Sequence, residues 1–403
     1  MPDTPRAAPR AAPRSALRSA LCKLAALIAP ASHAPRIEAF ALVVLSPVPL
    51  LGLGAVFGGL WAWAAFFWVG IFIFTLDVMI RRAAPDAPEG QEFPAADGLS
   101  QLLAGLHFGL LALAVWAISG GSGLDAVSRV PLFLAFGLFF GQVSNSNAHE
   151  LIHRADKRLF LFGKWVYISL LFGHHTSAHR HVHHRFAATP DDPNTAQLGE
   201  SFWAFAPRAW AGSFIAGWEM ERARRLPRLQ AEAALAQGPL ARVRLWFAAR
   251  RPYADYLLGG AAIALLVTLW FGAGGLLAYL ALCAHAQIQL LLSDYVQHYG
   301  LERAALGNGR YAPVDETHSW DAPHPVSSLW MLNAPRHSDH HAHPARPYPA
   351  LRLGETGAPG RPILPRSLPA MATLALFPRL WRRVMDKRVR ALRKAQSVAQ
   401  SAQ

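Results

Sequence analysis

Cysteine is nearly absent from this sequence. Only Cys22 and Cys283 occur among 403 residues, far apart and each in apolar surroundings. Their scarcity excludes a disulfide framework, a cysteine-ligated zinc or iron–sulfur site, and a fused rubredoxin, because all of these need sets of cysteines. A metal site in this protein must therefore be built from other side chains.

Charged residues are also scarce. They make up 16% of the chain, against 53% hydrophobic residues, which is too apolar a balance for an ordinary soluble enzyme. Lys and Arg outnumber Asp and Glu by 39 to 25, giving a formal net charge of +14. The basic residues lie in the terminal segments and between apolar runs, without a nucleic-acid-binding module. We therefore predict a membrane protein that meets anionic lipid and an acidic partner protein, and no nucleic acid.

The composition divides the chain into three parts. Residues 1–36 are rich in Pro, Ala and Arg, which predicts a disordered basic N-terminal extension. Residues 37–352 contain the apolar runs and nearly all histidines, and we expect them to form one membrane domain. Residues 353–403 are expected to be a basic cytoplasmic C-terminal tail.

Six apolar runs, paired around short glycine-containing turns, predict an all-α integral membrane fold with six transmembrane helices in three hairpins. The runs cover residues 39–57, 60–80, 99–118, 130–143, 256–271 and 276–292. The hairpin tips contain almost no Lys or Arg, so the positive-inside rule places both termini and the histidine-rich segments in the cytoplasm. We expect a bacterial inner membrane protein. A shorter apolar run, 159–172, is expected to lie near the membrane interface.

The histidines cluster with helical spacing. Between Pro335 and Pro344, three of them stand at i, i+3 and i+4, which is expected to bring them onto one helical face within reach of a common metal. An HExxH pattern begins at His149, and two further groups follow it. The nine clustered histidines are His149, His153, His179, His183, His184, His298, His337, His340 and His341.

Nine imidazoles are more than one metal can use. Neutral imidazole is a good ligand for Fe, Zn, Cu or Ni, so two metals sharing the nine is the economical interpretation. Iron is the leading candidate for redox chemistry because no cysteine is available. HExxH alone would suggest a zinc protease with Glu150 as general base, but it leaves seven clustered histidines without a role. A metal transporter is disfavoured because the clusters lie outside the apolar runs.

The remaining histidines lack this spacing. His107 and His285 lie within apolar runs and are expected to be packed or hydrogen-bonded. Structural or surface positions are expected for His33, His318, His324 and His343, while His174, His175 and His181 adjoin the clusters and stay open.

Four strings resemble the integral-membrane alkane hydroxylases, the alkane 1-monooxygenase branch of the fatty-acid desaturase and hydroxylase superfamily. They are HELIHR from His149, HHRFAATPDDP from His183, DYVQHYGL from Asp294 and RHSDHHAHPARPY from Arg336. The resemblance implies that the nine clustered histidines bind two non-haem Fe ions in a cytoplasmic His-rich di-iron cap, over a hydrophobic channel between helices. Departures from the family pattern occur at Ala178, Val182, Gln297 and Asp321.

The predicted activity is hydroxylation of the terminal carbon of alkanes to primary alcohols with O2. Four carboxylates are expected to orient the imidazoles by hydrogen bonds rather than to bind metal: Glu150, Asp191, Asp192 and Asp339. No flavin, nicotinamide or iron–sulfur motif is present, and the resemblance implies a rubredoxin or ferredoxin with its reductase as electron donor. A fatty-acyl desaturase or an aromatic-methyl hydroxylase of the same superfamily is the alternative, and an HExxH zinc protease is a weaker one.

Overall fold

The computed structural model describes residues 36–80, 85–235, 238–358 and 360–401, together with Ser19, Cys22, Lys23, Ala26 and Ala83. In this part of the chain the protein is mostly helical. The sheet found there is a single hairpin of β1 (Ala305–Gly307) and β2 (Arg310–Tyr311). The basic extension expected over residues 1–36 lies almost entirely outside the described residues.

Five of the described helices are long and apolar enough to cross a membrane. They span Ile37–Phe57, Gly59–Met79, Ala95–Ile118, Ala126–Ile152 and Tyr253–His298. The six predicted apolar runs fall within these five helices, because the last two runs belong to one helix of 46 residues. The helical fold is therefore confirmed, with five candidate membrane helices where six were predicted.

The first two membrane helices form a hairpin that turns on a glycine. Its elements are α2 (Ile37–Leu45), α3 (Val48–Phe57), α4 (Gly59–Phe67), the π helix η1 (Trp68–Phe72) and α5 (Ile73–Met79). Gly58 has a φ of +60°, and a Cβ there would lie 2.6 Å from Cδ2 of Leu124, so a larger residue would be strained in this turn. The N–H of Gly59 donates to Oγ of Ser128 at 2.8 Å, which ties the hairpin tip to the next helix pair.

The fourth predicted run is longer in the structure than in the sequence pattern. After α6 (Ala95–Ile118), a continuous rod is built from α7 (Ala126–Leu138), the π helix η2 (Phe139–Ser144) and α8 (Asn145–Ile152). The polar side chains of residues 145–147 are buried inside the protein. The rod therefore continues past the apolar run and carries His149, the first histidine of the HExxH pattern, directly on a membrane helix.

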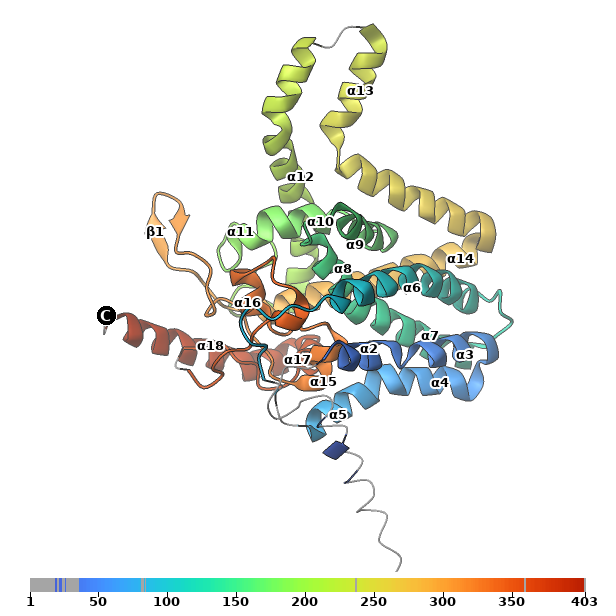
Figure 1. Ribbon diagram of the computed structural model, residues 1–403, viewed down its shortest axis with the longest axis horizontal. Coiled ribbons are helices and arrows are strands. Elements are labelled where there is room, and N and C mark those ends of the chain that lie inside the picture. The colour runs from blue at the N-terminus through green and yellow to red at the C-terminus, as the bar shows by residue number, and fades with distance from the viewer. Residues whose placement is uncertain are drawn as a thin grey trace, which may run out of the picture.

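The last membrane helix, α14 (Tyr253–His298), bends at one residue. Gly272 has a φ of +66° and a ψ of −166°, which are non-helical values, and glycine adopts them at low cost. Figure 1 shows the two arms of α14 on either side of this bend. The predicted turn over 272–275 is thus reduced to a single residue within a helix.

The segment between the two long membrane rods is helical throughout much of its length. It contains α9 (Lys157–Ser169), α10 (His175–Ala178), the π helix η3 (His179–His183), α11 (His184–Phe186), α12 (Phe202–Leu235) and α13 (Gly238–Arg250). The short apolar run predicted near the interface corresponds to α9, whose buried Tyr167 donates its hydroxyl to the carbonyl of Asn145 at 3.2 Å. Helices α12 and α13 project away from the other elements as a long hairpin (Figure 1).

The segment from Pro325 to Ser401 packs against the membrane helices. Its elements are α15 (Pro325–Trp330), α16 (His337–Ala342), the 3-10 helix η4 (Tyr348–Ala350), α17 (Leu368–Ala375) and α18 (Pro378–Ser401). Asp77 of α5 accepts hydrogen bonds from the backbone N–H groups of Val326 and Ser327 at 2.9 and 3.1 Å. Tyr299 donates to Asp386 of α18 at 2.6 Å. Residues expected to form a C-terminal tail therefore include a helix packed on the protein body.

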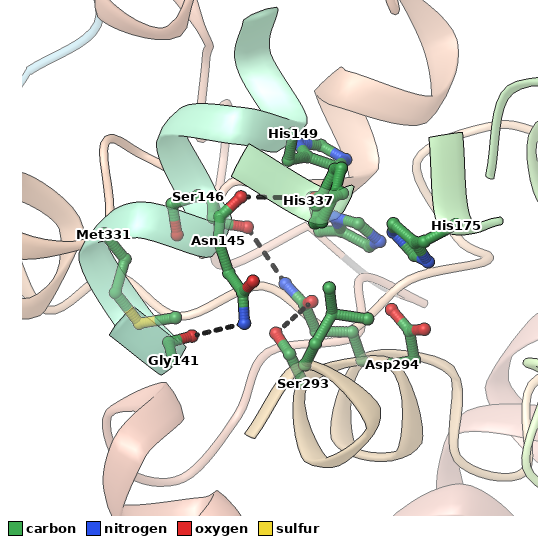
Figure 2. A pocket seen from close by; sticks show the side chains of 13 residues that line it. Gly141, Asn145, Ser146, His149, His175, Ser293, Asp294, Met331 and His337 are labelled. Carbon is green, nitrogen blue, oxygen red and sulfur yellow. Dashed lines mark hydrogen bonds between the residues drawn. The ribbon is translucent and has the colours of Figure 1, made fainter. Parts of the chain in front are cut away.

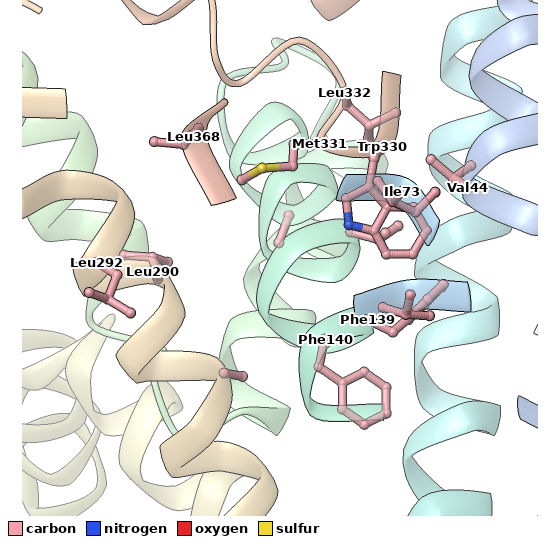
Figure 3. Close-up of a cluster of buried hydrophobic side chains, with 14 of the residues drawn as sticks. Val44, Ile73, Phe139, Phe140, Leu290, Leu292, Trp330, Met331, Leu332 and Leu368 are labelled. Carbon is pink, nitrogen blue, oxygen red and sulfur yellow. The ribbon is translucent and has the colours of Figure 1, made fainter. Parts of the chain in front are cut away.

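A hydrophobic core joins the membrane helices to the C-terminal helices. Figure 3 shows Val44, Ile73, Phe139, Trp330 and Leu368 in this core, contributed by α2, α5, η2, α15 and α17. The indole of Trp330 is fully buried, and its Nε1–H donates to Oε1 of Gln142 at 2.7 Å. This contact fixes α15, and with it the chain that leads into α16, against the rod formed by α7, η2 and α8.

Candidate metal centre

The structure brings the nine clustered histidines together at one end of the membrane helices. They come from the end of the α8 rod, from η3 and α11, from the last residue of α14, and from α16. Two groups form, and within each group the ligand atoms lie within 4.8 Å of one another. The five-histidine group is His149, His153, His179, His184 and His340, and the four-histidine group is His183, His298, His337 and His341.

The ring nitrogens of the five-histidine group point at a shared centre. Nε2 of His179 lies 2.7 Å from Nε2 of His149 and 2.9 Å from Nε2 of His184. Nε2 of His340 lies 3.1 Å from Nε2 of His184. Four of the five imidazoles thus converge through the same ring atom.

The four-histidine group converges in the same way. Nε2 of His337 lies 3.1 Å from Nε2 of both His298 and His341. The Nδ1–H of His298 donates to the carbonyl of His318 at 3.2 Å, so the Nε2 of His298 is left with a lone pair that faces the group.

A metal cation fits both groups. A neutral imidazole has one N–H and one lone pair, and crowded lone pairs need a proton or a cation between them. The Nε2 atoms of His153 and His183 are buried without a hydrogen-bond partner in the described part of the chain. Burial, followed by the neighbouring imidazoles, holds the pKa of His179, His184 and His340 well below the ordinary value. These rings are therefore neutral and able to bind metal.

The π helix explains the division of the second histidine string. The spacing of His179 and His183 at i, i+4 predicts a common face on an α helix, but η3 is a π helix, with i→i+5 periodicity. His179 therefore joins His184 in the five-histidine group, while His183 points into the other group.

The expectation that the three histidines of α16 serve a common metal is corrected in the same way. His337 and His341, one helical turn apart, lie in the four-histidine group, whereas His340 lies in the five-histidine group. Because the two groups are adjacent, one short helix supplies ligands to both.

One of the four predicted orienting carboxylates touches a clustered histidine. Asp192 accepts from the Nδ1–H of His183 at 2.9 Å and from the hydroxyl of Thr195 at 2.7 Å. Burial lowers the pKa of His183, but the charge and hydrogen bond of Asp192 outweigh it and raise this pKa above its ordinary value. The contact fixes the tautomer in which Nε2 carries the lone pair.

The other three carboxylates lie elsewhere. Asp339 accepts hydrogen bonds from Arg346, from His343 and from the backbone N–H of Arg352. It therefore holds the loop after α16 in place. Asp191 is exposed. Glu150 is buried, with Oε1 3.6 Å from Nη1 of Arg154. In the described part of the chain, none of the three forms a hydrogen bond to a clustered histidine.

The histidines outside the two groups have other partners. His107 is buried, and its Nε2 lies 2.8 Å from Oγ of Ser169. His343 is half exposed and hydrogen-bonded to Asp339. His175 stacks on His179, with ring centroids 5.1 Å apart, and lies at the cavity described next.

A small cavity of about 50 Å³ adjoins both histidine groups. His149 borders it from one group and His337 from the other, and Figure 2 shows both beside Met331 and Asp294. A cavity of this volume has room for a small molecule or for the end of a slender chain.

Asp294 is a buried cavity residue that the sequence reasoning missed. Its Oδ2 accepts from Nδ2 of Asn194 at 2.6 Å. Gln297 lies one turn further along α14, where its Nε2–H donates to the carbonyl of Ala334 at 2.9 Å. The signal was present in the sequence, since Asp294 precedes His298 by one helical turn on the same face.

Comparison with known proteins gives a consistent result. A family model described as fatty acid desaturase matches residues 127–373. Alkane 1-monooxygenase 2 of Pseudomonas aeruginosa is 31% identical over 359 residues, which cover 87% of this chain and 90% of that protein. Alkane 1-monooxygenase of Ectopseudomonas oleovorans is 32% identical over 295 residues, 72% of this chain and 68% of that protein. The region that the family model matches contains every histidine of both groups.

Proposed function

We propose that this member of the fatty acid desaturase family hydroxylates the terminal carbon of alkanes to primary alcohols. Within the family, the chain groups with the alkane 1-monooxygenases. One atom of O2 enters the alcohol and the other leaves as water, so each turnover also consumes a pair of electrons and a pair of protons. The observation that carries the proposal is the pair of histidine groups beside one small cavity.

Each histidine group would hold one non-haem iron, with its imidazole nitrogens as ligands. Iron bound by these residues would supply the redox chemistry that the reaction of O2 with an unactivated C–H bond requires. All-nitrogen donor sets also suit zinc, copper and nickel, and iron is favoured here by the redox chemistry of the matched relatives. Asp192 is proposed to orient His183, while Glu150 and Asp339 support neighbouring segments.

The cavity supports attack at the chain end. Its small volume admits a terminal methyl group more easily than the middle of an alkyl chain. Leu290 and Met331 line it beside polar residues of α8 and α14, and the core around Trp330 lies next to it. These side chains would exclude bulk water from the reacting carbon.

The proposed topology has six membrane passes. The bend at Gly272 supports counting the two arms of α14 separately. In this arrangement residues 37–352 form the monooxygenase domain of a bacterial inner membrane protein, with segments 1–36 and 353–403 and both histidine groups on the cytoplasmic side.

Electrons would come from a rubredoxin- or ferredoxin-type protein with its reductase. The net charge of +14 favours an acidic carrier. The chain would thus bind its reductant transiently at the cytoplasmic face.

The test is direct. The protein is purified in detergent, its metals are measured, and it is supplied with alkane, O2 and a rubredoxin or ferredoxin reducing system. We expect about two iron ions per chain and a primary alcohol. A double bond in the product would instead indicate a desaturase, and one zinc ion with no O2 consumption would contradict both the metal and the reaction.

The matched control compares His340 of α16 with His343, the residue that directly follows this helix. His340→Ala removes a proposed ligand, whereas His343→Ala alters a half-exposed residue outside both groups. Metal and activity should fall in the first variant and persist in the second.

A further inference from the structure

A basic cavity opens beside η3, on the side away from the histidine groups. Its volume of about 470 Å³ lies within the range of about 300–1,000 Å³ usual for small-ligand pockets. It is bounded by α9, α10, η3, the middle of α12 and the start of α14 (Figure 1). Five cationic side chains line it: Lys164, Arg180, Arg224, Arg225 and Arg251.

The two carboxylates of this cavity are already engaged. Asp255 lies 3.4 Å from Nζ of Lys164 and 3.2 Å from Nε of Arg251. Glu221 lies 3.4 Å from Nε of Arg225 and accepts from the hydroxyl of Ser177 at 2.7 Å. The lining therefore keeps an excess of positive charge after these pairs are counted.

Arg180 and Arg224 carry that excess. Within the described residues, neither has a carboxylate within salt-bridge distance. The guanidinium of Arg180 lies 4.9 Å above the ring of Phe160, and Nη1 of Arg224 lies 2.7 Å from Nδ1 of His181. Both arginines line the same cavity, so their like charges repel each other. An anion placed between them would relieve this repulsion.

A buried hydroxyl marks the same cavity independently. Thr176 is 1% exposed and lines the cavity, and its Oγ1 has no hydrogen-bond partner in the described part of the chain. An unmade buried hydrogen bond is costly. A ligand oxygen within reach would accept this hydrogen bond.

We propose that this cavity binds a phosphate group, held by Arg180 and Arg224 and by a hydrogen bond from Thr176. Paired guanidinium groups match the geometry and charge of phosphate oxygens. The cavity lies where the membrane helix α14 begins, so the phosphate of an anionic phospholipid headgroup can reach it from the membrane surface. Both arginines are exposed, so a free phosphate ion can reach it from solvent.

The concave shape favours a small anionic group over an acidic protein, because protein partners need broad contact areas.

The position of the cavity links the bound phosphate to the histidine groups. Arg180 lies in η3 between His179 and His183, which belong to different histidine groups. A phosphate bound by Arg180 would hold the π helix that supplies a ligand to each group.

The full-length protein in detergent is the material for the test, with native mass spectrometry as the readout. The probes are dioleoylphosphatidylglycerol, which is anionic, dioleoylphosphatidylcholine, which is zwitterionic, and inorganic phosphate as competitor. We expect one molecule of the anionic lipid to bind in preference to the zwitterionic lipid and to be displaced by phosphate. Arg180→Gln combined with Arg224→Gln should weaken binding by about tenfold or more, since two charge-assisted contacts are lost.

Two further variants keep the outcome interpretable. Arg228→Gln removes a cation of α12 that is paired with Glu232 outside the cavity, and it should bind the lipid as the unaltered protein does. Thr176→Val, which leaves both arginines in place, should weaken binding by a smaller factor, and metal content should be measured in every variant.

Each outcome bears on the proposal. Arginine-dependent binding of phosphate without preference for the anionic lipid would support the site and identify soluble phosphate as its source. Equal binding of both probes by the unaltered protein and the double variant would overturn the proposal. A double variant that lost affinity only for an acidic electron-donor protein would also overturn it, because the arginines would then mark a protein-docking face.

Discussion

The two histidine groups differ in how their imidazoles are held. In the four-histidine group all four residues are buried, and two are oriented by oxygen acceptors, His183 by Asp192 and His298 by a backbone carbonyl. In the five-histidine group three residues are partly exposed. No carboxylate among the described residues hydrogen-bonds to that group. One group thus relies on oriented ligands, and the other has an additional imidazole.

This difference predicts unequal tolerance to ligand loss. A metal commonly needs about four donors or more. Removing one imidazole from the four-histidine group leaves three protein ligands, fewer than this number, whereas the five-histidine group keeps four. The predictions below test this asymmetry.

The largest effect is expected from His298→Ala. The four-histidine group would lose its metal, so metal content should fall by about half and alcohol formation by on the order of 100-fold or more. Metal analysis and product assays measure both. The control is His318→Ala, which keeps the backbone carbonyl that His298 contacts. Full metal content in His298→Ala would contradict the assignment of this group.

Asp192→Asn should have the next largest effect. A neutral amide holds the Nδ1–H of His183 less strongly, and outer hydrogen-bond partners of metal ligands are typically worth about 10–100-fold in metal affinity or activity. Metal titration of the apoprotein measures the change. Asp191→Asn, at the exposed neighbouring position, should leave affinity unchanged, and equal losses in both variants would argue against a specific role for Asp192.

His153→Ala should cost less than either. Four imidazoles would remain in its group, so we expect metal to be retained and activity to fall by less than about tenfold. The comparison with His298→Ala is the informative one. A loss of metal as complete as in that variant would show that the fifth imidazole is required and that the groups are equivalent.

The smallest effect concerns the rate of metal removal. Because three residues of the five-histidine group are partly exposed, its metal should leave first when a chelator is added. We expect the metal to be lost in two phases, and metal analysis of samples taken over time would detect them. A single phase would mean that exposure does not distinguish the groups.

Local sequence pattern predicted the membrane helices well where residues face lipid or apolar neighbours. It failed where polar residues face the protein interior. The rod through α8 continues past its apolar run because residues 145–147 are buried against other helices, and no pattern within one segment reveals that. The projecting hairpin of α12 and α13 was not predicted, because residues 222–250 are rich in arginine and, where described, mostly exposed, so no long apolar run marks them.

The sequence by itself determined which residues could form the metal centre, because imidazole chemistry and helical spacing are local properties. Only the tertiary structure decided how they are shared. Spacing alone suggested that His183 pairs with His179 and that His340 pairs with His337 and His341, but the structure separates them. Asp192, and not Asp191, accepts a hydrogen bond from an imidazole. A π-helical turn shifts by one residue the positions that share a helix face. Which group a histidine joins therefore depends on the helix type and on how separate elements converge in the tertiary structure.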